Sequence, residues 1–110
     1  METKDAVAAL AALAQDSRLT IFRLLVEAGP RGLPAGSIGR RLEMPGATLS
    51  FHLTQLRQSG LVRHWRNGRS IVYAADFPAM NALMGFLTEN CCGGDTRRQP
   101  EEFEHATPAR

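Results

Sequence analysis

Residues 44–74 read MPGATLSFHLTQLRQSGLVRHWRNGRSIVYA, and this stretch decides the fold. Its first half predicts a helix from about Gly46 to Ser59, because leucines recur at the three- and four-residue spacing that lines one helix face. The predicted buried stripe consists of Leu49, Leu53 and Leu56. Gly60 is the expected C-terminal stop, since glycine readily adopts the left-handed backbone that ends many helices.

The second half of this stretch predicts a β-hairpin. The runs Leu61 to Arg66 and Arg69 to Ala74 favour strands, and Asn67-Gly68 separates them. Asn-Gly between two such runs is the strongest short-range hairpin signal in a sequence. A helix followed at once by a hairpin is therefore expected here.

Working outward, three helices are expected before this stretch and one after it. The first is Ala-rich and carries, at helical spacing, Val7, Leu10, Ala11 and Ala14. The second runs from Ser17 to Glu27 with Asp16 as its N-cap, and a short third has Pro34 in its first turn and runs to Leu42. The second helix is expected to supply core residues, namely Leu19, Phe22, Leu24, Leu25 and Val26. With a last helix over Phe77 to Glu89, the expected fold class is mainly α with a β-hairpin wing, a winged helix-turn-helix.

Length and composition bound the class of protein. A chain of 110 residues and 12.0 kDa is one domain by size. We expect this domain to span residues 1–92, and the polar residues 93–110 to form a disordered tail. With 44% apolar and 22% charged residues, the composition argues against disordered, fibrous and membrane-spanning chains. No apolar run approaches the roughly 20 residues that a bilayer requires, so we expect no membrane partner. The two cysteines, Cys91 and Cys92, are adjacent and cannot link distant parts of a small secreted fold, so we expect a cytoplasmic protein.

Positive charge is concentrated in the middle of the chain. Residues 16–74 hold nine arginines and three acidic residues, a net charge of +6, whereas the whole chain carries +2. Arginine suits phosphate and guanine edges better than lysine does, because its guanidinium is a planar fork of donors. The charge distribution favours a nucleic-acid partner.

The order of elements points to double-stranded DNA, because the second helix of a helix-turn-helix enters the major groove and a basic hairpin reaches toward the backbone or minor groove. The candidate DNA contacts are Ala47, Ser50, Phe51, Thr54 and Gln58 on the outer face of the 46–59 helix, together with Arg40, Arg57, Arg66 and Arg69. Phe51 either packs on a thymine methyl or is half-buried against its neighbours, and the second interpretation is favoured. His52 adjoins the leucine stripe, which favours a packed, hydrogen-bonded histidine over a metal ligand.

At this point the chain resembles the ArsR/SmtB family of winged-helix repressors over about residues 5–92. The matching blocks are LAQDSRLTIFRLL at 13–25, SFHLTQL at 50–56 followed by GLV at 60–62, and GRSIVY at 68–73. The resemblance implies a homodimer that binds a partly palindromic operator and leaves it when an inducer binds. It also implies dimer contacts through the first and last helices, with Val7, Leu10, Met80, Leu83, Met84 and Leu87 as the candidate interface residues.

The sensor sites known in this family are mostly absent. Members with a cysteine pair at the start of the third helix would need cysteines within 33–37, which here reads LPAGS. The zinc site of the last helix needs an aspartate and spaced histidines. The chain has Asp76, but residues 77–104 contain no histidine. Cys91 and Cys92, the only cysteines, resemble the C-terminal vicinal pair of arsenic-responsive members, several of which add a third cysteine that this chain lacks.

Thiolate chemistry also favours a soft ion at this pair. Inorganic arsenite can use three thiolates, whereas methylarsenite already carries one carbon and needs two, so two cysteines fit the methylated species best. Arsenite or antimonite remains open, with a hydroxide or a thiol from the other protomer as third ligand. We expect trivalent arsenic as the inducer, no organic cofactor and no enzymatic activity.

Four alternatives remain. One is that Cys91 and Cys92 are idle, and a second is that they form a redox switch, oxidising with each other or across the dimer to release DNA. A third is that they hold zinc together with His105 and one more ligand. A thiol enzyme with Cys91 as nucleophile is disfavoured because no activating histidine lies nearby. Coupling to DNA is expected from placement, since the pair follows the helix assigned to dimerisation and its movement would change the distance between the two recognition helices.

Overall fold

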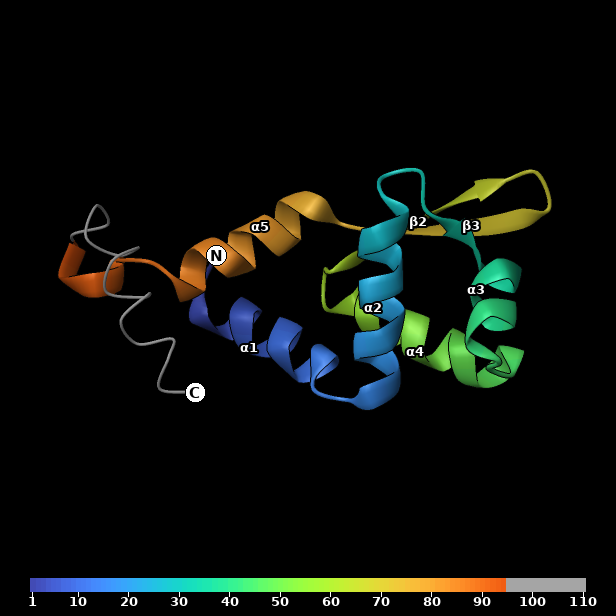
Figure 1. Ribbon diagram of the computed structural model, residues 1–110, viewed down its shortest axis with the longest axis horizontal. Helices are drawn as coiled ribbons and strands as arrows, with labels where there is room; N and C mark the ends of the chain where they lie inside the picture. Colours follow the sequence, from blue (N-terminus) through green and yellow to red (C-terminus); the bar gives the residue numbers. More distant parts are fainter. Residues whose placement is uncertain (95–110) are drawn as a thin grey trace, which may run out of the picture.

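The computed structural model describes residues 1–94. The elements follow one another as α1 (Thr3–Leu13), α2 (Asp16–Ala28), β1 (Leu33–Pro34), α3 (Ala35–Leu42), α4 (Gly46–Gln58), β2 (Val62–Asn67), β3 (Ser70–Ala75), α5 (Phe77–Leu87) and the short turn η1 (Cys91–Gly94). The expected winged helix-turn-helix is confirmed: α3 and α4 form the helix pair, and the β2–β3 hairpin forms the wing (Figure 1).

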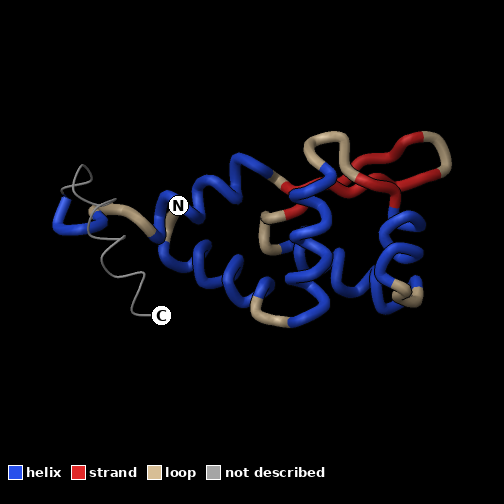
Figure 2. The backbone as a smooth tube through the Cα atoms, in the orientation of Figure 1, coloured by secondary structure: helices blue, strands red, loops and turns tan. Residues whose placement is uncertain are grey.

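The two ends of the fold have different architecture. Helices α1 and α5 pack against each other at one end, while α3, α4 and the hairpin occupy the other, with α2 between them (Figures 1 and 2). No helix within residues 1–94 is long and apolar enough to cross a membrane.

The wing is part of a three-stranded antiparallel sheet with strand order β1-β3-β2. The predicted turn is wrong by one residue, because Asn67 pairs with Ser70 and the two-residue loop is Gly68-Arg69. Gly68 has φ +65°, so the residue without a Cβ takes the left-handed position and Asn67 extends the strand instead.

Strand β1 was not predicted, because two residues carry no periodic signal. Leu33 pairs with Tyr73 and Pro34 with Val72, on the edge of the sheet where a proline is tolerated. Gly32 precedes the strand with φ +69°, and a Cβ there would lie 2.3 Å from the carbonyl oxygen of Tyr73. Glycine therefore lets the two backbones approach.

The core lies between α1, α2, α4 and the base of the sheet. Its largest fully buried side chains are Ile21, Leu25, Ile38, Leu53, Leu56 and Leu61. Two expectations for α2 are wrong. Leu19 is 44% exposed rather than buried, and the N-cap is Gln15, whose side-chain oxygen accepts a hydrogen bond of 2.9 Å from the Arg18 amide. Asp16 is already the first helical residue.

Helix α1 turns a face of small residues inward, with Ala6, Ala9 and Ala12 buried. The larger residues Val7 and Leu10 point outward and are exposed. Small side chains let α1 lie close to its neighbours, and the apolar stripe predicted from sequence is left on the surface of the single chain.

Candidate nucleic-acid interface

Helix α4 presents two opposite faces. Its inner face buries the predicted Leu49, Leu53 and Leu56 together with His52. At 3.6 residues per turn, positions 47, 51, 54 and 58 form a single face on the other side. Of the residues there, Ala47, Phe51 and Gln58 are exposed and Thr54 is half-buried. Four of the candidate DNA contacts thus share one outward face.

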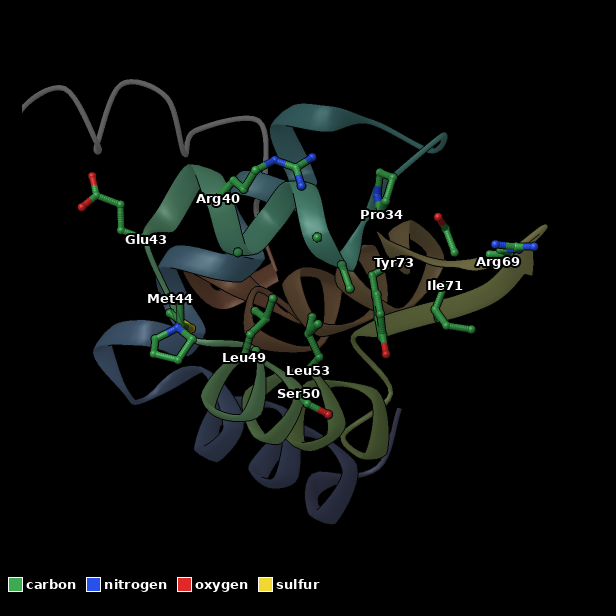
Figure 3. A pocket seen from close by; sticks show the side chains of 16 residues that line it. Pro34, Arg40, Glu43, Met44, Leu49, Ser50, Leu53, Arg69, Ile71 and Tyr73 are labelled. Carbon is green, nitrogen blue, oxygen red and sulfur yellow. The ribbon is translucent and has the colours of Figure 1, made fainter.

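Three of the five remaining candidates lie around a hollow between α3, the start of α4 and β3, which we call the wing groove. It has a volume of about 730 Å³ and is lined by Arg40 from α3, Ser50 from α4 and Arg69 from the wing turn (Figure 3). Leu49 and Tyr73 also line the groove. Glu43, just after α3, lines it as well, so the groove combines cationic, polar and acidic groups over an apolar lining.

Backbone groups add to the positive character of the groove. Helix α4 begins at Gly46, and its N-cap Pro45 gives no side-chain hydrogen bond, so the first amide groups of α4 have no side-chain partner there. Such N–H groups carry partial positive charge at a helix start and bind anions. The places of Gly46 and Tyr73 in the groove were not predicted. Ile71 and Tyr73 are two positions apart on β3 and therefore share one face of the strand, and this spacing is the signal that identifies the groove side.

The wing distributes its arginines over both faces of the sheet. Arg66 pairs with Ile71, which lines the groove, so Arg66 lies on the groove side. Arg63 lies on the opposite side, with its guanidinium carbon 4.8 Å from the centre of the Trp65 ring. Arg57 is exposed near the end of α4 and does not line the groove.

A buried polar link supports α4 from behind. The Arg18 guanidinium donates from Nε to the Ala12 carbonyl oxygen at 2.7 Å, and its Nη1 lies 3.3 Å from Nδ1 of His52. Arginine is only a donor, so Nδ1 accepts and the imidazole carries its proton on Nε2. His52 is 8% exposed, which confirms the prediction of a packed, hydrogen-bonded histidine. The arginine partner, 34 positions away in sequence, was not predicted.

Phe51 differs from its prediction. Its side chain is 58% exposed, so the expectation of a half-buried ring is wrong. The ring meets His52 edge-on, with centroids 5.5 Å apart and planes at 64°. Position 51 lies opposite the leucine stripe, and this edge contact is the one ring contact that Phe51 makes within residues 1–94.

The candidate dimer residues lie at the α1 and α5 end. Four of them are exposed, namely Val7, Leu10, Met84 and Leu87. Met80 is partly buried. Leu83 is 4% exposed and packs into the chain's own core, so it supports this surface from behind.

The cysteine pair follows α5. This helix ends at Leu87, two residues before the predicted Glu89, and the Thr88 hydroxyl donates to the Met84 carbonyl oxygen at 2.9 Å. In η1, Cys91 is half-buried and Cys92 is exposed with φ +60°, and their Sγ atoms lie 3.0 Å apart. Both are thiols.

Residues 1–94 contain no cluster of three histidine, cysteine or acidic side chains that would hold a metal. A third ligand from this part of the chain is therefore absent in the single protomer. The predicted zinc partner His105 and most of the expected tail, residues 95–110, lie outside the described residues.

Comparison with known proteins agrees with this geometry. Residues 13–64 match a family described as a helix-turn-helix domain. The chain is 30% identical over 89 residues to the HTH-type transcriptional regulator YgaV of Escherichia coli. The aligned region covers 81% of this chain and 88% of YgaV.

Several solved structures share the fold, and two of them illustrate the similarity. An ArsR-like transcriptional regulator from Rhodococcus superposes with a TM-score of 0.69 at 26% identity, covering 94% of this chain and 92% of that one. A homodimeric winged helix-turn-helix DNA-binding domain from Mycobacterium bovis superposes with a TM-score of 0.63 at 26% identity, covering 79% and 81%. These relatives are regulators and not enzymes, which removes the thiol-enzyme alternative. Because of its fold, its helix-turn-helix and its similarity to these relatives, the chain belongs to the ArsR-type family of winged helix-turn-helix transcriptional regulators.

Proposed function

We propose that this protein is a homodimeric repressor that binds operator DNA through α4 and the wing, and that trivalent arsenic bound to Cys91 and Cys92 releases it. The DNA-binding part rests on the wing groove. There Arg40, Arg69 and the start of α4 combine three sources of positive charge beside the outward face of the recognition helix. Phosphate contacts from such groups position a protein on DNA, while the outward side chains of α4 read base edges.

The dimer is supported by the exposed apolar side chains at the other end of the fold. Val7, Leu10, Met84 and Leu87 each expose more than two fifths of their surface on two helices that pack together. A second copy would cover this surface, because contiguous exposed apolar residues mark interaction sites. A twofold dimer of this kind presents two recognition helices, which bind half-sites about one turn of DNA apart.

The arsenic part rests on the distance between the two sulfurs. If each sulfur bonds one ion at about 2.3 Å, a separation of 3.0 Å corresponds to a sulfur–ion–sulfur angle of roughly 80°. Trivalent arsenic has three bonds and a lone pair, with angles closer to a right angle than to the tetrahedral angle that zinc prefers. The two sulfurs therefore lie close enough for one soft ion to bond both.

Methylarsenite is the favoured inducer because two thiols satisfy it. Each thiol would displace one hydroxyl group of the arsenical, forming an arsenic–sulfur bond and releasing one water, and the methyl group would occupy the third position. Inorganic arsenite would keep a hydroxide or take a third thiol from the other protomer, since residues 1–94 supply no third soft ligand. Antimonite follows the same chemistry.

A DNA-release assay tests the proposal. Fluorescence anisotropy of the reduced protein on a labelled duplex from upstream of its own gene is titrated with methylarsenite, arsenite, antimonite, zinc and peroxide. We expect methylarsenite to release the duplex at the lowest concentration. Cys91→Ser and Cys92→Ser should bind DNA normally and resist release, while the neighbouring control Glu89→Gln should respond like the wild type.

The outcomes separate the alternatives. Release of the serine variants by arsenicals would refute the sensor assignment, and absence of DNA binding by the reduced wild type would refute the repressor itself. A redox switch is the second candidate, because the two thiols lie 3.0 Å apart and can oxidise with each other or with those of the other protomer. Release by peroxide and not by arsenicals, reversed by a dithiol, would establish that function instead.

A further inference from the structure

We infer that Phe51 reads the 5-methyl group of a thymine in each operator half-site. This inference rests on the proposed binding of operator DNA by α4. It assigns one base contact to a residue that the sequence alone favoured as half-buried.

The exposure of Phe51 requires an explanation. A phenyl ring that is 58% exposed leaves a large apolar area in water at the centre of the outward face of α4. This face is not the apolar surface of α1 and α5, which lies at the other end of the fold (Figure 1). Its neighbours at one turn are Ala47, Thr48, Thr54 and Gln55, and the ring stays 58% exposed beside them.

The ring is held while it is exposed. His52 packs against its edge at 5.5 Å, and the imidazole is buried and bound through Nδ1 to the Arg18 guanidinium. Arg18 is itself fixed by the carbonyl oxygen of Ala12 at 2.7 Å. A preordered aromatic loses less conformational entropy on binding than a freely rotating side chain. The arrangement thus fits an anchor better than an incidental surface residue.

The chemistry of the ring selects the target. Phenylalanine cannot hydrogen-bond, so among the groups displayed in the major groove its complement is the one apolar group, the thymine methyl. Phosphates and the polar edges of guanine, cytosine and adenine offer it no favourable partner. The polar residues Thr54 and Gln58 on the same face are available for those edges.

The test removes the methyl group and nothing else. The preferred duplex of the wild-type protein is selected from a random library, and each thymine is then replaced in turn by deoxyuridine. Affinities are measured by anisotropy for the wild type, Phe51→Ala and the control Thr48→Ala, an exposed neighbour on the same helix. Because each variant is compared with itself on two duplexes, a change in its folded fraction cancels.

One position in each half-site should show the effect. Losing a contact the size of one methyl group should weaken wild-type binding about fourfold when one half-site is changed and about fifteenfold when both are changed. Phe51→Ala should bind the thymine and deoxyuridine duplexes equally at that position, and Thr48→Ala should keep the wild-type ratio. The inference is overturned if no position distinguishes wild type from Phe51→Ala. Failure to select any duplex would instead refute the proposed DNA binding.

Discussion

The close approach of Gly32 to β3 gives a sharp test of how the wing is attached to the helical core. Alanine at position 32 would meet two penalties. The left-handed backbone, with φ +69°, costs an L-residue roughly 1–2 kcal/mol. Its Cβ would also lie 2.3 Å from the Tyr73 carbonyl oxygen and 2.9 Å from its carbonyl carbon.

The second penalty cannot be relieved by rotating a side chain, because both atoms belong to the backbone of β3. Forced shifts of this kind cost typically about 1–3 kcal/mol. Gly32→Ala should therefore destabilise the protein by about 2–5 kcal/mol. The matched control is Gly68→Ala, which has nearly the same φ of +65° and no atom within 4 Å of its Cβ, so it should cost only about 1–2 kcal/mol.

Urea denaturation followed by circular dichroism measures both free energies of unfolding. All variants are compared at one protein concentration, because association makes the stability of an oligomer depend on concentration. Gly32→Ala should lower the midpoint clearly more than Gly68→Ala. Equal losses would refute the reasoning, since they would mean that backbone conformation alone matters and that β1 does not press closely on β3.

Three further predictions concern the groove, the dimer surface and the polar link. Arg66→Ala should reduce the slope of the logarithm of the DNA-binding constant against log salt by about 0.9, the value for one phosphate contact. Arg63→Ala, on the other face of the sheet, should leave this slope unchanged, and anisotropy at several salt concentrations measures both. Met84→Glu should shift the protein from dimer to monomer in sedimentation equilibrium, because it places a charge on an exposed apolar surface; an unchanged dimer would exclude that part of α5 from the interface. Arg18→Lys should cost about 1.5–3 kcal/mol of stability, because one ammonium group cannot make both hydrogen bonds of the guanidinium, to Ala12 and to His52. Thermal unfolding at fixed protein concentration tests this, and an unchanged midpoint would contradict it.

Local patterns made most of the fold predictable. The spacing of Leu49, Leu53 and Leu56 predicted the buried face of α4 correctly, because helical periodicity is recorded in neighbouring residues. The same logic placed Ala47, Phe51 and Gln58 together on the outer face. Helix ends were less accurate, since α5 stops two residues early, at Leu87.

Contacts between distant segments were not predictable from such patterns. Strand β1 exists only because Gly32 lets the chain lie against Tyr73, about forty positions later. The link between Arg18 and His52 likewise joins two helices through side chains, and neither residue shows a local signal for the other. The exposure of Phe51 depends on which elements cover α4, and the sequence of α4 alone does not carry this information.

These distant contacts also give the proposed sensor a physical route to DNA. The cysteine pair follows α5, α5 packs on α1, and the last turn of α1 supplies the Ala12 carbonyl that holds Arg18. Arg18 in turn holds His52 on the recognition helix. A displacement of α5 along α1 would therefore act on α4 both through the spacing of the dimer and through this link. A coupling of about 1–3 kcal/mol corresponds to a 5- to 150-fold change in affinity, so a loss of one or two hydrogen bonds along the route is sufficient for release.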